Sequence, residues 1–306
     1  MKTPVIIDTD PGIDDAVALI TSFFAPSIDI KLLCSTAGNL GIDVTTQNVL
    51  HLCELYEQNI PVAKGLPHPL RRELITTNRH GKNGFGTYEY EGVSTSPIEL
   101  PAFEAMHYAL QLYPGTTILV MGPLTNVAKL LEVYPDDIHK IKEIVFMGGT
   151  KDNVLQQDKP YPEFNISRDP EACELVLNSG ANITIIPMDF GHYAYIDEAE
   201  IKRLRSINET GKLFSIMYEE YKDGHVEDEH AATHDSCATA YLIEPTLFKF
   251  EYVKATVQFF EGKGVLVTEV MPCTTNFKLA IDMDYDGFKN LYYGLLGVAK
   301  KPDEML

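Results

Sequence analysis

The 306-residue chain has no tryptophan, few cysteines and few basic residues. Its five cysteines are odd in number and show no C-x-x-C spacing, which favours reduced thiols in a cytoplasmic protein over a zinc site or a disulfide framework. No apolar run approaches the ~20 residues that a membrane-spanning helix needs. Charged residues within the first eight positions also argue against a secretory signal. We therefore expect neither a membrane segment nor a disulfide scaffold.

Basic residues are far fewer than acidic ones. Lys and Arg total 25 against 44 Asp and Glu, so the formal net charge is −19. A surface this acidic repels phosphate backbones, and nucleic acid is not an expected partner. Highly anionic small substrates are disfavoured less strongly, because a local pocket can override the net charge.

Short apolar runs alternate with helical patterns along the chain. This alternation predicts an α/β fold, an open and mostly parallel sheet flanked by helices, in a single domain over 1–306. The expected strands are 4–10, 30–38, 61–65, 116–122, 143–149, 183–189, 252–260, 264–270 and 276–282, of which the last two are compatible with an antiparallel edge near the C-terminus. The expected helices are 13–24, 44–57, 103–113, 124–134 and 170–180. Two glycine-rich or charged stretches, 76–92 and 222–233, are expected to be mobile loops that carry binding residues.

Four carboxylates fall within eight residues where the first strand meets the first helix: Asp8, Asp10, Asp14 and Asp15. The carboxyl edge of an open α/β sheet is where ligands bind. A helix N-terminus stabilises each charge by only ~0.3–1 kcal/mol, which is too little for four. Helix capping explains one or two of these acids. A hard cation with oxygen ligands, such as calcium, is the stronger explanation.

The same cluster allows a second interpretation. Phosphatases of the haloacid-dehalogenase type also begin with a strand-borne D-x-D, whose first Asp would be Asp8 here. The Pro11-Gly12 turn and the paired Asp14-Asp15 do not suit that pattern, and such an enzyme would act on a phosphoryl substrate with magnesium. A protein that binds nucleoside or calcium without catalysis is a further alternative.

Four more motifs follow the DTDPGIDDA segment (8–16) in order: A-G-N at 37–39, G-P-L-T-N at 122–126, E-F-N with D-P-E-A at 163–172, and H-D-S-C-A at 234–238. Together they resemble the inosine–uridine-preferring nucleoside hydrolases over nearly the whole chain. The resemblance is strongest to bacterial ribonucleoside hydrolases of mixed purine and pyrimidine specificity. It implies an open α/β fold with the site at the carboxyl edge of the sheet.

The resemblance also implies an activity and a metal. Water would cleave the N-glycosidic bond of a ribonucleoside and release ribose and the nucleobase. Calcium would be held by Asp10, by Asp15 in bidentate fashion, by the backbone carbonyl of Met121 and by Asp235. These oxygen ligands suit a hard ion. Asp10 would act as general base on a water that the calcium positions.

The ribose hydroxyls would be bound by Asp14, Asn39, Glu163 and Asn165. Relatives usually place an asparagine six residues before the Glu of E-F-N, but this chain has Gln157 there. The nearest asparagine is Asn153, in a stretch that looks two residues longer. Either residue is a candidate for contacting the 5′-hydroxyl.

The leaving base needs a proton, and two histidines are candidates. His234 precedes the predicted ligand Asp235 and resembles the family acid, although it could instead only orient that ligand. His80 resembles a family histidine on the loop near the base. The absence of Trp disfavours the purine-specific parasite subtype, which stacks the base on tryptophan. Tyr218, Tyr221 and Phe164 are alternative stacking candidates or core residues. Base preference stays open, and so does the choice between homodimer and homotetramer.

Overall fold

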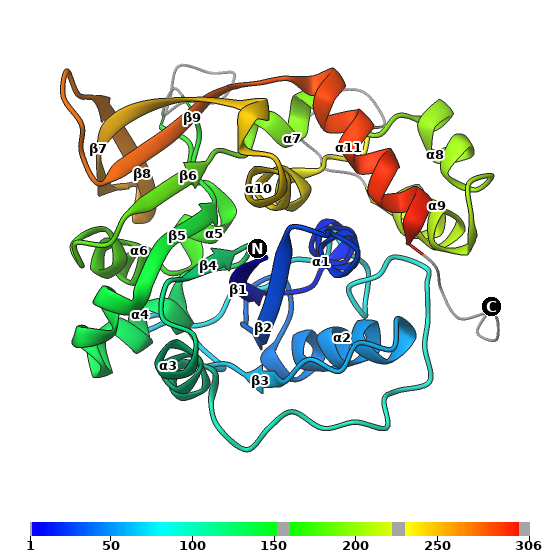
Figure 1. The fold of residues 1–306 in the computed structure, drawn as a ribbon, viewed down its shortest axis with the longest axis horizontal. Coiled ribbons are helices and arrows are strands. Elements are labelled where there is room, and N and C mark those ends of the chain that lie inside the picture. The colour runs from blue at the N-terminus through cyan, green and yellow to red at the C-terminus, as the bar shows by residue number, and fades with distance from the viewer. Residues whose placement is uncertain (1, 152–159, 222–229, 300–306) are drawn as a thin grey trace.

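The computed structural model describes residues 2–151, 160–221 and 230–299. Within these residues the strands form one nine-stranded sheet in the order β3-β2-β1-β4-β5-β6-β9-β7-β8 (Figure 1). The strands are β1 (Thr3–Thr9), β2 (Ile28–Ser35), β3 (Val62–Lys64), β4 (Thr116–Val120), β5 (Ile141–Met147), β6 (Ile183–Ile186), β7 (Phe248–Phe260), β8 (Lys263–Val270) and β9 (Phe277–Met283).

Helices separate the strands along the chain, as βα units require. They are α1 (Ile13–Phe23), α2 (Ile42–Leu55), α3 (Ala102–Leu112), α4 (Thr125–Val133), α5 (Phe164–Arg168), α6 (Pro170–Leu177), α7 (Asp189–Tyr193), α8 (Glu198–Leu204), α9 (Glu209–Glu220), α10 (His234–Ile243) and α11 (Tyr285–Val298), with short 3₁₀ turns η1 (Pro135–Lys140) and η2 (Pro245–Leu247). None of the helices in the described parts of the chain is long and apolar enough to cross a membrane.

The predicted α/β class and the antiparallel edge are confirmed, but the pairing at that edge differs from the prediction. The strands β1 to β6 pair in parallel with one another, and β9 pairs in parallel with β6. β7 runs antiparallel to both β8 and β9 and lies between them. The two strands expected at that edge, 264–270 and 276–282, therefore both pair with β7 and not with each other. β7 is 13 residues long, which lets it pair with both neighbours along different parts of its length.

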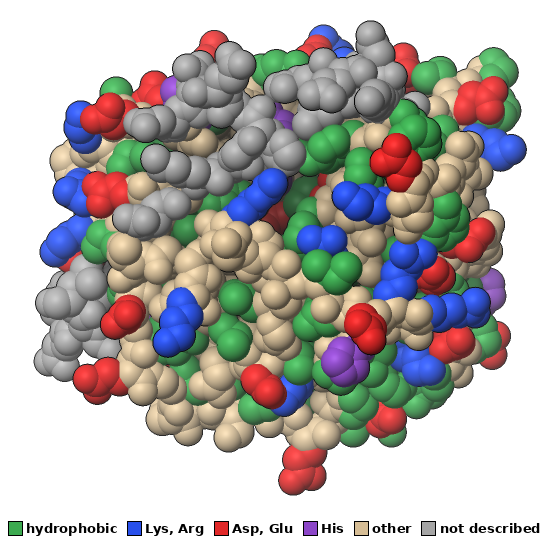
Figure 2. Space-filling model, turned by 180° about the vertical axis from the view of Figure 1, so that it is seen from behind, with side chains coloured by type: hydrophobic (Ala, Val, Ile, Leu, Met, Phe, Trp, Pro, Cys, Tyr) green, Lys and Arg blue, Asp and Glu red, His purple; other side chains and the backbone are tan. Residues whose placement is uncertain are grey.

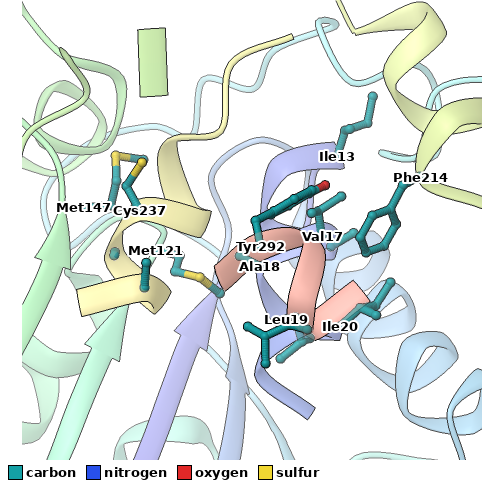
Figure 3. Packing of buried hydrophobic residues seen from close by; sticks show 14 of the residues in the cluster. Ile13, Val17, Ala18, Leu19, Ile20, Met121, Met147, Phe214, Cys237 and Tyr292 are labelled. Atoms are coloured by element: carbon teal, nitrogen blue, oxygen red, sulfur yellow. The ribbon is translucent and has the colours of Figure 1, made fainter. Parts of the chain in front are cut away.

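Each face of the sheet is covered by its own apolar cluster. Alternate residues of β1 point to opposite faces, so Val5 and Ile7 belong to one cluster and Ile6 to the other. On the first face α1 packs against α9, α10 and α11, as the side chains of Phe214 and Tyr292 around α1 illustrate (Figure 3). The other face carries α3, α4 and α6. Burial on both faces explains why the parallel strands are short, nearly continuous apolar runs.

The sheet has a topological switch point between β1 and β4. From β1 the chain moves outward to β2 and β3, and then returns to the other side of β1 with β4, β5 and β6. In open α/β sheets a crevice opens at the carboxyl ends of the strands at such a point. Asp10 follows β1 and Met121 follows β4, so the predicted metal ligands lie at this crevice.

Several helices have no sequence-based prediction: α5, α7, α8, α9, α10 and α11. The stretch 76–92 is irregular, as predicted. Of the second predicted loop, 222–229 lies outside the described residues. The five cysteines are free thiols, four of them buried and Cys273 exposed.

Candidate active site

The end of β1 and the start of α1 bring the acidic cluster together. The chain leaves the strand at Thr9, turns at Pro11 and Gly12, and enters the helix at Ile13. Asp14 and Asp15 therefore stand in the first helical turn, where the helix dipole favours negative charge. All of these carboxylates are buried.

Asp15 is the most strongly held of these acids. Its carboxylate accepts hydrogen bonds from the Thr9 hydroxyl at 2.6 Å and from the backbone N–H groups of Gly12 and Asp10 at 3.1 and 3.2 Å. The Asn39 side-chain amide donates a further bond at 3.1 Å. Burial nevertheless raises the pKa of Asp15 above its usual value. These hydrogen bonds therefore do not fully compensate the burial of the negative charge on Asp15.

Asp10 is enclosed by backbone on two sides. One carboxylate oxygen, Oδ2, accepts the backbone N–H of Asn39 at 2.6 Å, while Oδ1 has no hydrogen-bond partner among the described residues. A Cβ at Gly38 would lie 2.1 Å from Oδ2, and one at Gly122 would lie 2.4 Å from Oδ1. Both positions need glycine because the main chain approaches Asp10 so closely. Burial, followed by the charges of Asp15 and Asp14, raises the pKa of Asp10 well above its usual value.

Three carboxylates form a group that could hold a metal ion. Asp14, Asp15 and Asp235 each offer an oxygen within 4.8 Å of the other two. Asp235 comes from the first turn of α10, so the N-termini of two helices face each other across the group. Burial and the charges of Asp15, Asp14 and Asp10 raise the pKa of Asp235 well above its usual value.

The residues fit a hard cation. The group consists of carboxylate oxygens only, and one buried oxygen of Asp235, Oδ1, has no hydrogen-bond partner among the described residues. The predicted ligands Asp15 and Asp235 belong to the group together with Asp14, and Asp10 is not a member of it. The carbonyl of Met121, the fourth predicted ligand, accepts a hydrogen bond from the Asn165 side chain at 2.7 Å. Calcium prefers oxygen ligands of this kind.

Glu163 and Asn165 face the acids from the other side of the crevice. Glu163 caps α5, and its carboxylate accepts the backbone N–H groups of Gly149, Asn165 and Ile166 at 2.9–3.2 Å. Burial raises the pKa of Glu163 despite these bonds. The side-chain amide of Asn165 donates to the carbonyls of Met121 and Met147, which fixes its orientation.

His234 begins α10 beside Asp235. Its Nδ1 lies 2.8 Å from the carbonyl oxygen of Met188, and since a carbonyl only accepts, Nδ1 carries a proton. A Cβ at Gly191 would lie 2.3 Å from this nitrogen, so the glycine makes the approach feasible. The His192 ring packs edge-on against His234 with centroids 4.9 Å apart. Proton exchange by His234 is thereby confined to Nε2.

His80 reaches the same site from the loop 76–92. The backbone N–H of Ile13 donates to its Nδ1 at 3.1 Å, so this nitrogen is unprotonated and the neutral ring carries its proton on Nε2. The ring lies against Gly12, where a Cβ would be 2.7 Å away. Its other neighbour is the stacked ring of Tyr221, with centroids 5.2 Å apart.

These residues line a pocket with about 540 Å³ of space between protein atoms, part of it open to solvent. Among the described residues predicted to act in catalysis, metal binding or ribose binding, only Asp10 is absent from its lining. The lining contains Asp14, Asp15, Asn39, His80, Met121, Glu163, Asn165, His234 and Asp235, together with the stacking candidates Phe164 and Tyr221. The third stacking candidate, Tyr218, is buried and lies 3.4 Å from the Tyr292 hydroxyl, so it is a core residue.

Some lining residues were not predicted from the sequence: Thr77, Arg79, Met147, Tyr161 and Met188. Thr77 and Arg79 neighbour His80 in the loop, Met147 is the last residue of β5, and Met188 comes shortly after the end of β6. Their position at the carboxyl ends of predicted strands could therefore have indicated from the sequence that the two methionines line the site. Asn153 and Gln157, the candidates for contacting the 5′-hydroxyl, lie outside the described residues.

Comparisons with known proteins agree with this geometry. The chain matches the family described as "Inosine-uridine preferring nucleoside hydrolase" over residues 5–290. It is 34% identical to the non-specific ribonucleoside hydrolase RihC of Escherichia coli, a match that covers 98% of this chain and 100% of the relative. RihC of Shigella sonnei is 35% identical with the same coverage.

Solved structures show the same fold. A plant nucleoside hydrolase, the PpNRh1 enzyme, superposes with a TM-score of 0.89 at 28% identity, covering 97% of this chain and 100% of that one. The purine-preferring ribonucleoside hydrolase of Gardnerella vaginalis shares the fold with a TM-score of 0.88 at 24% identity, over 97% and 99% of the two chains.

The family match and these relatives, together with the buried carboxylates at the switch point of the sheet, identify a hydrolase that acts on N-glycosidic bonds. The chain belongs to the inosine–uridine-preferring nucleoside hydrolase family.

Proposed function

We propose that this enzyme hydrolyses the N-glycosidic bond of ribonucleosides, both purine and pyrimidine, with bound calcium and with Asp10 as general base. The observation that carries the proposal is the set of buried carboxylates facing His234 across one pocket. Relatives at 34–35% identity that are named non-specific ribonucleoside hydrolases support the broad base range.

Calcium would be held by Asp10, Asp15, Asp235 and the Met121 carbonyl, with Asp14 close enough to contribute. When bound, the ion offsets the charge of the buried acids, positions ribose hydroxyls and lowers the pKa of a water. One oxygen of Asp10 and one of Asp235 have no hydrogen-bond partner in the described parts of the chain, which supports this assignment. A buried carboxylate oxygen without a partner is costly unless a cation compensates it.

The side chains of the site have separate roles in the proposed reaction. Asp10 accepts the proton of the attacking water through Oδ1, while the Asn39 N–H holds Oδ2. Asp14, Asn39, Glu163 and Asn165 bind ribose hydroxyls, and their hydrogen bonds strengthen as positive charge builds on the sugar ring. Since water is the only nucleophile, one displacement with inversion at C1′ follows.

The leaving base takes its proton from His234 in this account. The Met188 carbonyl holds the Nδ1–H of His234, so Nε2 is the atom that binds and releases the proton. His80 is less suited to this role, because a second ring proton would displace the Ile13 N–H from Nδ1. We assign His80 to donate a hydrogen bond from Nε2 to the base, beside the stacking ring of Tyr221.

Further parts of the proposal rest on sequence and relatives alone. Asn153 or Gln157 would contact the 5′-hydroxyl. The protein would act in the cytoplasm as a homodimer or homotetramer, a choice that sedimentation of the purified protein decides.

The direct test is release of reducing sugar from inosine, adenosine, uridine, cytidine and a 2′-deoxynucleoside, with calcium and with a chelator. The proposal expects ribose from both base classes, poor hydrolysis of the deoxynucleoside and loss of activity in chelator. A folded, calcium-loaded enzyme that releases no ribose from any of these nucleosides would contradict it.

A further inference from the structure

Asn48, a fully buried residue of α2, joins two parts of the site that are far apart in the sequence. Its side-chain Nδ2 donates to the carbonyl oxygen of Pro11 at 2.9 Å and to that of Asn83 at 2.8 Å. Its Oδ1 accepts the hydroxyl of Tyr90 at 2.6 Å. Both amide protons are therefore used, and rotation of the side chain would leave buried polar groups unpaired. Asn48 thus fixes the loop 76–92 and the turn after β1 relative to each other.

The turn that Asn48 holds carries the acidic cluster. Pro11 directly follows Asp10, and acidic side chains lie at the bottom of the hollow seen in Figure 2. The loop packs so closely here that a Cβ at Gly84 would lie 2.7 Å from Nδ2 of Asn48 and 2.8 Å from the Pro11 carbonyl oxygen. Gly84 also has a φ of +93°, which an L side chain rarely adopts. The loop and the acid turn therefore meet at a position that only glycine fits.

His80 lies between two attachments of the loop. On one side the backbone N–H of Thr77 donates to the carbonyl of Asn39 at 3.0 Å. On the other side the carbonyl of Asn83 is held by Asn48. The His80 ring, which contacts the start of α1, is thus carried by a short stretch that is tied at both ends to residues beside the acids.

Aromatic side chains hold the later part of the loop on α2. The ring of His51, one turn further along α2, stacks on Tyr90 with centroids 3.9 Å apart, and its Nε2 lies 3.1 Å from the Tyr88 hydroxyl. Phe85 is completely buried in the same apolar cluster. Segments with many buried contacts open rarely. We therefore expect 83–90 to stay docked and motion of the loop to be limited to its earlier part.

We propose that Asn48 is a positioning residue for the reaction: by joining the loop to the acid turn, it places the His80 ring to meet the nucleobase before the nucleoside binds. This inference rests on the proposed function. Asn48 is not among the described residues that line the pocket, so it acts only through the turn and the loop. Its loss should weaken nucleoside binding, because the loop must then be ordered when the nucleoside binds.

The test measures kcat and KM for inosine in wild type, Asn48→Ala, His80→Ala and the double variant. Asn48→Ala should raise KM about tenfold and lower kcat less than about threefold. If Asn48 acts through His80, the two effects are not additive, so Asn48→Ala should raise KM less than about twofold in the His80→Ala background. Tyr90→Phe removes only the hydroxyl that Asn48 accepts and should raise KM about two- to fivefold. It also keeps the test available if Asn48→Ala does not fold.

Asn126→Ala is the matched control. Asn126 is also a fully buried asparagine, and it forms hydrogen bonds with Asp8 at 2.8 Å and with Ser35 and Leu66 at 3.0 Å. None of these bonds reaches the loop. Asn126→Ala should lower the Tm about as much as Asn48→Ala does, but KM for inosine should stay within about twofold of wild type.

Amide hydrogen exchange gives a readout that does not depend on activity. The N–H of Gly86, which donates to the His80 carbonyl at 2.9 Å, should exchange at least about tenfold faster in Asn48→Ala than in wild type. In Asn126→Ala, which is destabilised to a similar extent, the exchange rate at Gly86 should rise much less.

The inference is overturned if exchange at Gly86 is unchanged in Asn48→Ala, or if Asn48→Ala and His80→Ala raise KM additively. It is also overturned if Asn126→Ala raises KM as much as Asn48→Ala does, which would show a merely structural role. Absence of ribose release from inosine by wild type would instead refute the proposed function, and this role of Asn48 with it.

Discussion

The backbone N–H of Asn39 donates to Oδ2 of Asp10 at 2.6 Å, and the side chain of the same asparagine donates to Asp15 at 3.1 Å. One residue from the loop after β2 therefore orients two acids from the β1–α1 turn. The Asp10 oxygen that faces away from Asn39 is left without a partner among the described residues. Asn39 thus positions the acids and also, as proposed, binds the ribose.

Replacing Asn39 by Ala keeps the backbone N–H but removes the bridge to Asp15. We expect the calcium concentration for half-maximal activity to rise about 10- to 100-fold, as for other residues that orient metal ligands. Asn178→Ala, at the exposed end of α6, should leave the calcium dependence as in wild type. An unchanged calcium dependence in Asn39→Ala would refute the positioning role.

The buried acids should make the metal-free protein less stable than it is with calcium. Asp235→Asn removes one charge from the repelling group, so we expect it to raise the Tm in chelator by roughly 2–6 °C, or about 1–2 kcal/mol. The same variant should lose most of the stabilisation that calcium gives to wild type. Thermal unfolding with and without calcium measures both effects.

Asp137→Asn provides the matched comparison. Asp137 is as buried as Asp235, but it contacts His107 at 2.6 Å and Lys140 at 2.9 Å. Loss of these partners should lower the Tm equally with and without calcium. If Asp235→Asn behaves like Asp137→Asn, the carboxylate group does not bind the ion.

His234→Ala should separate proton donation from the rest of the reaction. We expect kcat on inosine to fall about 10²- to 10⁴-fold, the range for a general acid. A riboside of 4-nitrophenol, whose leaving group needs no proton, should be cleaved at nearly the wild-type rate. His80→Ala should affect KM for inosine more than kcat. Equal losses on both substrates in His234→Ala would exclude the acid role.

Gly38 and Gly122 bring the main chain close to the Asp10 carboxylate, and substitution of one of them tests whether this close packing is needed for activity. A methyl group at Gly122 would lie 2.4 Å from Oδ1, so Gly122→Ala should displace the carboxylate and lower kcat about 10²-fold. Gly41, before α2, has open space around its Cβ position and a φ of −67°, so Gly41→Ala should be nearly neutral. Similar activity in both variants would show that Asp10 tolerates movement.

Much of the site could be predicted because its signals are local. Asp10, Asp14 and Asp15 lie within six residues, and the strand–turn–helix pattern around them places them at the carboxyl edge of the sheet. Asn39 and Met121 follow β2 and β4, the two strands that flank β1, so a parallel sheet brings them to the same edge as the acids.

Other features depend on contacts between distant residues. The proton position on His80 follows from a hydrogen bond to Ile13, 67 residues away, and no local pattern indicates it. Arg79 and Tyr161 line the pocket because of the path that irregular loops take, and this path could not be predicted from the sequence. The position of β7 between β8 and β9 depends on its length and on which strands it meets. The sequence pattern of a strand does not show which strands will pair with its two sides.

The central claim is that Asp10 activates the water that cleaves the riboside. The measurement is kcat of Asp10→Asn on inosine at saturating calcium, with nucleoside binding followed by calorimetry. The account predicts that kcat falls at least about 10³-fold while inosine still binds within about tenfold of wild type. Near-normal turnover in a variant that binds calcium and inosine would contradict it.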